Sequence, residues 1–178
     1  MLKHSRKYPV LLAFLSCLLL LAGCAGYSGN RLQPGIATLG DVVAEMGEPA
    51  MRWKNADGGE QLAYPRGPTG PHTYMAMIGP DGRLQKIEQV LDMRHFARIV
   101  AGQSDQAAVL RLLGPPVPQW TVYFAARDEL VWEWLYCDDF SIEGRFDVLF
   151  DATSGLVRTT MQRQELRGRA LTPPYCGR

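Results

Sequence analysis

Apolar and polar positions along the chain follow two periodicities, first that of a helix and then the alternation of β-strands. After Thr38, apolar residues recur at intervals of three and four up to Gly47, which predicts a short helix with Thr38 as its N-cap. Short apolar runs then alternate with turns rich in glycine, proline and aspartate, as in antiparallel strands joined by tight turns. The strands predicted from these runs are 51–54, 61–64, 73–78 and 84–90.

The same order returns in the second half of the chain. A helical stretch covers residues 91–100, and Ser104 or Asp105 caps a further helix that ends at Gly114. The strands predicted after it are 120–124, 130–137, 146–150 and 156–163, with a turn at 151–155. Four landmarks lie 67 residues before a counterpart of the same type: Gly35, Val42, Gly47 and Pro49 before Gly102, Val109, Gly114 and Pro116. A constant offset of this kind indicates an internal repeat.

These elements predict an α+β fold of two tandem units. Each unit is expected to contain a helix segment followed by an antiparallel meander of three to four strands. The helices should lie on one sheet face, with the other face open to solvent.

The N-terminal segment has the composition of a secretory signal, with basic residues, an apolar core at 10–21 and small residues before Cys24. The core is shorter than the roughly 20 residues that a spanning helix needs. The stretch Leu21-Ala22-Gly23-Cys24 matches the lipobox of bacterial lipoproteins, and this match implies that Cys24 carries a diacylglyceryl lipid. An ordinary cleaved signal with a chance cysteine is the alternative.

A lipidated Cys24 would anchor the protein to a membrane rather than span it. Ala25 follows in place of the aspartate that retains many lipoproteins in the inner membrane, so we expect a periplasm-facing protein on the outer membrane. The expected organisation is a signal peptide (1–23), a lipidated tether (24–33), a first unit (34–90), a second unit (91–166) and a C-terminal tail (167–178).

Composition is that of a globular protein, with 47% hydrophobic and 21% charged residues. Of 19 lysines and arginines, three fall in the signal, which leaves 16 against 18 acidic residues. No basic cluster stands out, so we expect no nucleic-acid partner.

Cysteine usage points to one candidate disulfide. Cys17 falls in the signal and Cys24 at the lipobox, so only Cys137 and Cys176 could pair in an oxidising periplasm. This bond would close a loop of roughly 40 residues and stabilise the fold by about 4 kcal/mol on the chain-entropy model. One buried thiol and one thiol on an exposed, frayed end is the alternative.

Residues with catalytic or metal-binding potential do not form a recognisable motif. His72 and His95 are not spaced as zinc ligands. Asp138 and Asp139 would point to opposite faces of a strand, so a solvated turn is expected there. The sequence has no nucleophile elbow, phosphate-binding glycine loop or suggestive Cys/His dyad. We therefore expect no catalytic residue, metal or cofactor, and a protein that is not an enzyme.

Aromatic residues on the expected strand 130–137 provide the candidate partner-binding site. Trp132, Trp134 and Tyr136 alternate and share one face. That face is either the core beneath the helices or, if the opposite face is the core, an open surface on which tryptophan and tyrosine would anchor a partner. The loop 65–71, with Arg66 and adjacent His72, is a second candidate contact or a flexible excursion.

The order of lipobox, tether, Gly-x-Ser/Thr, apolar helix and Gly-x-Pro before a meander resembles the SmpA/OmlA (BamE-like) family. The matching stretch runs from Gly102 to Pro116, and residues 35–49 are a more diverged copy. Those proteins are small outer-membrane lipoproteins that serve the machinery inserting β-barrels. The resemblance implies a non-catalytic binding or scaffolding module in outer-membrane protein assembly or envelope maintenance, with the barrel-assembly machinery as partner.

The doubled unit departs from that family, whose assembly factor has a single copy. Two copies are similar to the secreted β-lactamase-inhibitor proteins, in which a curved sheet grips an enzyme. This similarity implies an alternative function as an inhibitor or binding module for a periplasmic enzyme. No partner-binding residue of either family matches a position in this chain.

Overall fold

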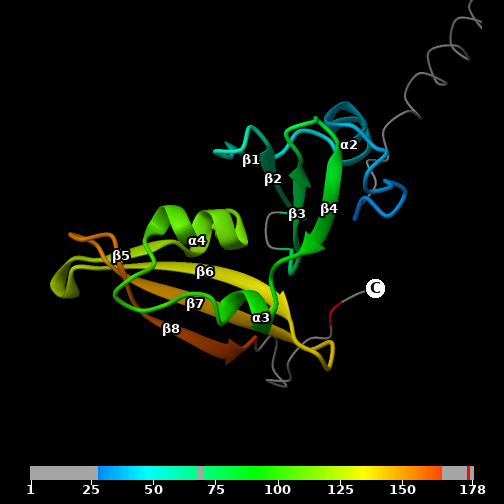
Figure 1. The fold of residues 1–178 in the computed structure, drawn as a ribbon. Coiled ribbons are helices and arrows are strands. Elements are labelled where there is room, and N and C mark those ends of the chain that lie inside the picture. Colours follow the sequence, from blue (N-terminus) through cyan, green and yellow to red (C-terminus); the bar gives the residue numbers. More distant parts are fainter. Residues whose placement is uncertain (1–27, 68–69, 166–175, 177–178) are drawn as a thin grey trace, which may run out of the picture.

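The computed structural model describes residues 28–67, 70–165 and 176. Within them the chain forms two four-stranded sheets, each antiparallel with its strands in sequence order (Figure 1). The expected α+β fold of two sheet units is confirmed. The signal peptide, Cys24 and most of the tail lie outside the described residues. No helix in the described part of the chain is long and apolar enough to span a membrane.

The elements follow the order expected from the sequence. The helices are α2 (Leu39–Met46), α3 (Met93–Phe96) and α4 (Gln106–Leu113), with the 3₁₀ turns η2 (Pro118–Trp120) and η3 (Ala125–Arg127). The first sheet contains β1 (Met51–Lys54), β2 (Glu60–Pro65), β3 (Thr73–Ile78) and β4 (Leu84–Gln89). The second contains β5 (Val122–Phe124), β6 (Glu129–Cys137), β7 (Glu143–Asp151) and β8 (Val157–Gln164).

Local capping explains where the two longer helices begin. Thr38 and Asp41 form a capping box at α2, in which each side chain accepts a hydrogen bond from the main chain of the other residue. Of the two candidate caps for α4, the structure selects Asp105, whose carboxylate accepts from Ala108 N at 2.7 Å. Ser104 instead accepts a hydrogen bond from Val100 N.

Equivalent main-chain hydrogen bonds support the internal repeat. In each unit, a glycine with positive φ precedes the long helix and joins it to the last strand of the sheet. The matched bonds are Gly35 N to Leu84 O (2.7 Å) and Gly102 N to Val157 O (2.8 Å), then Leu84 N to Ala37 O (2.8 Å) and Val157 N to Ser104 O (2.9 Å). The two units therefore share a main-chain scaffold as well as an element order.

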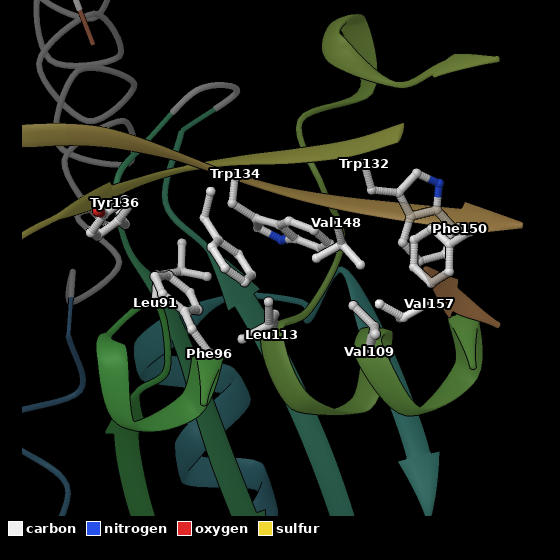
Figure 2. Close-up of a cluster of buried hydrophobic side chains, with 11 residues drawn as sticks. Leu91, Phe96, Val109, Leu113, Trp132, Trp134, Tyr136, Val148, Phe150 and Val157 are labelled. Carbon is white, nitrogen blue, oxygen red and sulfur yellow. The ribbon is translucent and has the colours of Figure 1, made fainter. Parts of the chain in front are cut away.

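The core of the second unit lies between its sheet and the helices α3 and α4. Figure 2 shows Val109 and Leu113 of α4 pointing toward the aromatic side chains of β6 and β7. Phe96 of α3 stacks on Phe146 with ring centroids 3.8 Å apart. The remaining members of this cluster are Leu91, Trp132, Trp134, Tyr136, Val148, Phe150 and Val157.

The first sheet has packed side chains on both faces. Val42 and Met46 of α2 are buried against one face. On the other face, Ala63 and Met75 are fully buried, and α4 of the second unit docks there. Gln61 Nε2 donates to the Arg111 carbonyl oxygen of α4. The expectation of an open second face is therefore wrong for the first sheet, because a helix of the other unit covers it.

Candidate binding surface along the edge of the second sheet

Strand β6 of the second sheet is only partly covered at its outer edge. The three residues of β5 pair with residues 129–131 of β6, from Val122 opposite Val131 to Phe124 opposite Glu129. Farther along, Val117 N donates to the Glu133 carbonyl oxygen at 2.9 Å. The edge of β6 therefore runs past β5 and η2 toward the junction with the first unit (Figure 1).

The edge strand β5 exposes consecutive apolar side chains. Val122, Tyr123 and Phe124 are 42%, 56% and 40% exposed. The Arg127 guanidinium lies over the Phe124 ring, 4.4 Å from its centroid, and donates to the Glu129 carboxylate at 2.9 Å. Exposed apolar residues grouped on one surface are typical of interaction sites. The main-chain groups at a sheet edge can also pair with a strand of another protein.

The turn after β5 fixes the strand in place. Asp128 adopts a left-handed conformation with φ of 47°, and its carboxylate accepts from the Thr153 hydroxyl at 2.6 Å and from the Tyr123 hydroxyl at 3.1 Å. The hydrogen bond from Thr153 holds the pKa of Asp128 below its ordinary value, and donation to Asp128 raises the pKa of Tyr123. At neutral pH, an ionised Asp128 therefore orders the Tyr123 ring, which lowers the entropic cost of binding through it.

Charged residues cover the outer face of the sheet beside this edge. Glu133 and Asp147 lie opposite each other on β6 and β7, and Arg163 donates to both carboxylates. Arg145 also pairs with Glu133 and lies over the Trp120 ring, 4.0 Å from its centroid. Burial raises the pKa of Glu133 and the facing Asp147 adds to this effect, while the two guanidinium groups oppose it.

The aromatic residues proposed for partner binding lie in the core instead. Trp132, Trp134 and Tyr136 are 9%, 1% and 7% exposed, beneath α3 and α4. Of the two interpretations offered by the alternation, the core one is correct, and a binding role for these rings on an open face is wrong. Tyr123 and Phe124 on β5 are exposed instead, as is Phe140 in the turn between β6 and β7, and no local sequence signal separated them from the buried ones.

The candidate disulfide partners Cys137 and Cys176 are bonded in the structure, with Cα atoms 6.0 Å apart. Cys176 N also donates to the Ser141 carbonyl oxygen at 2.9 Å. His72 Nε2 lies 3.9 Å from Cys137 Sγ, so the region beside the 65–71 loop contacts the second unit. The lipidation site, Cys24, lies outside the described residues.

The other residues with catalytic or metal-binding potential make contacts that stabilise the fold. The Asp138 carboxylate accepts from Phe140 N and Ile142 N, so it closes a turn. His95 is buried, with Nδ1 2.8 Å from the Asp92 carboxylate. Among the described residues, no group of three histidine, cysteine, aspartate or glutamate side chains could hold a metal ion.

Comparison of the chain with protein-family models, with curated proteins and with solved structures found no match. The resemblance to the SmpA/OmlA family therefore rests on the sequence motifs. The edge of β6, with β5 and Trp120 beside it, is the candidate surface that the geometry provides.

Proposed function

We propose that the protein is a lipoprotein anchored to the outer membrane through Cys24, facing the periplasm. It acts as a non-catalytic binding or scaffolding module in outer-membrane protein assembly or envelope maintenance. The lipobox supports the anchor, and the resemblance to the SmpA/OmlA family supports the process.

The observation that carries the binding role is the ordered, exposed edge strand β5. Tyr123 and Phe124 project from a strand whose following turn is fixed by Asp128. Large aromatic side chains that are held in one conformation are the commonest anchors of protein interfaces. A partner that covers this strand would bury both rings and continue the sheet edge.

Substitution of the anchor tests the location. Cys24→Ser should release the protein from the membrane fraction into the soluble periplasm. Ala25→Ser, next to the same cysteine, is the matched control and should stay with the membrane. Retention of the Cys24→Ser protein on membranes would refute the anchor.

Substitution of the edge tests the binding role. Crosslinking in intact cells, followed by capture of the tagged protein, should recover a partner with the wild type and lose it with Tyr123→Ser plus Phe124→Ser. Phe140→Ser is the control, since Phe140 is 79% exposed in the turn between β6 and β7. Equal recovery with all three proteins would contradict a role for β5.

A second candidate function, an inhibitor or binding module for a periplasmic enzyme, is favoured by the doubled unit. The same capture separates the two functions. Subunits of the barrel-assembly machinery support the first, whereas one soluble enzyme without that machinery supports the second.

A further inference from the structure

Strand β8 forms the second edge of its sheet, on the side opposite β5 (Figure 1). It pairs only with β7. At the start of the strand, Val157 bonds away from β7, because Gly102 N donates to Val157 O at 2.8 Å and Val157 N donates to Ser104 O at 2.9 Å. Beyond this point, within the part of the chain that the structure describes, no hydrogen bond reaches the outer main-chain groups of residues 159–164. Every residue of β8 after Val157 is exposed or half-buried, so this edge is accessible.

The other three edge strands of the described sheets have features that discourage pairing. β5 has only three residues, and β1 and β4 carry the exposed lysines Lys54 and Lys86. Short strands and lysines are common ways to prevent a sheet edge from pairing with another chain. β8 has eight residues and contains neither lysine nor proline. Its edge is therefore suited to the addition of a strand from another chain.

The two arginines of β8 are bonded to carboxylates of their own sheet. Arg158 donates to the Asp151 carboxylate at 2.7 Å, and Arg163 donates to the Asp147 carboxylate at 2.8 Å. These carboxylates balance the positive charge of the strand, so the edge has no excess charge that would select an acidic partner. The edge therefore favours a strand that is neutral and polar.

β8 itself has this character and is complementary to a second copy of itself. When two β8 strands run antiparallel about Met161, this residue lies opposite its own counterpart. The other opposed pairs are Thr160 with Gln162 and Thr159 with Arg163. Opposed residues share a sheet face and pack against each other, so two methionines that are each 50% exposed would cover one another and no like charges would meet. The pairing ends at Thr159 and leaves the hydrogen bonds of Val157 intact.

We propose that β8 pairs with β8 of a second copy of this chain, in an antiparallel register centred on Met161. The two four-stranded sheets then form one continuous sheet, and the interface is isologous. The contact over residues 159–163 is smaller than a standard interface of roughly 1,200–2,000 Å², so the dimer is weak and crosslinking is the suitable measurement. It leaves β5 at the opposite edge free, and it does not depend on the proposed function.

Crosslinking at position 161 tests the register. Met161→Cys is produced as the full chain, and intact cells are treated with a short, membrane-permeant bismaleimide. Directly opposed Cβ atoms in an antiparallel pair are about 5 Å apart, so this variant should form a covalent dimer. Lys86→Cys, exposed on the edge strand β4, is the matched control and should remain monomeric. The wild type gives the background, because Cys137 and Cys176 are bonded to each other.

A charge exchange at the same position tests whether the added strand belongs to a second copy. Two differently tagged copies are expressed together, crosslinked with formaldehyde and captured through one tag, and recovery of the other tag is measured. Met161→Lys in both copies opposes two like charges and should lower recovery by roughly 5-fold. Met161→Lys in one copy with Met161→Glu in the other should restore it. Met161 is 50% exposed, so these substitutions should preserve the fold, and restoration by the exchange excludes misfolding as the cause of the loss.

Three results would overturn the inference: no dimer from Met161→Cys, equal dimer yields from positions 161 and 86, or no restoration by the lysine and glutamate pair. A crosslink from position 161 to a different protein in place of the dimer would overturn it as well. The proposed function has its own readout, since the variants of Tyr123 and Phe124 test the partner at β5.

Discussion

Replacing Gly114 by alanine should destabilise the protein more than the same change at Gly47. The two glycines end α4 and α2 with nearly the same backbone, φ 77° and 84° with ψ −172° in both. Only glycine adopts this region readily, so each alanine costs about 1–3 kcal/mol from the backbone alone. This contribution cancels when the two substitutions are compared.

The difference comes from the space around each site. A Cβ at Gly47 would meet nothing within 4 Å, whereas a Cβ at Gly114 would lie 2.9 Å from Thr73 Cγ2 of the first unit. Overpacking of this kind adds about 1–3 kcal/mol. The extra cost at Gly114 therefore measures how tightly α4 docks on the first sheet.

Equilibrium unfolding in denaturant, with the disulfide intact, measures both costs. Thr73→Ser removes the methyl group that the added Cβ would strike, so combining it with Gly114→Ala should recover most of the extra cost. Combined with Gly47→Ala, the same substitution should be additive. Equal costs at the two glycines, or no recovery by Thr73→Ser, would refute the docking of α4 between the units.

Three other features of the described residues allow similar tests. Cys137→Ser with Cys176→Ser should lower the free energy of unfolding by about 4 kcal/mol, because the bond spans 39 residues, and an unchanged denaturant midpoint would contradict this. Tyr64→Phe should leave the stability equal or raise it by up to about 1 kcal/mol, since burial raises the pKa of Tyr64 to about 12 and its hydroxyl has no partner among the described residues. A hydrogen bond from Ser154 N helps to lower the pKa of Asp151 from 3.8 to about 2. The free energy of unfolding that this carboxylate contributes is complete above about pH 4 and should be lost as the pH drops toward 2. Asp151→Asn should make this loss smaller when unfolding is measured as a function of pH.

Elements of the fold could be predicted because their signals are local. Thr38 and Gly47 mark α2 through its capping box and its glycine backbone, and both signals lie within the helix and its caps. The docking of α4 on the first sheet could not be predicted, because it depends on residues far apart in sequence. Arg111, on the side of α4 that meets the first unit, lies over the Trp53 ring at 5.9 Å, and neither residue alone predicts that contact.

The candidate site shows the same limit. Alternation in β6 correctly placed Trp132, Trp134 and Tyr136 on one face but left open which face the helices cover. Glu133 lies on the opposite face, yet it is only 6% exposed, because Arg145 and Arg163 cover it. The exposure of β5 depends on where the neighbouring strands stop, which alternation does not encode.

Photo-crosslinking from β5 in living cells tests the central claim of a partner on the sheet edge. Tyr123 is replaced by a photoreactive phenylalanine analogue in the wild-type lipoprotein, and Phe140 is replaced in the same way as the control. A partner on the sheet edge should give a crosslink from position 123 to a discrete envelope protein of the barrel-assembly machinery, with none from position 140. No crosslink from position 123, or the same products from both positions, would contradict it.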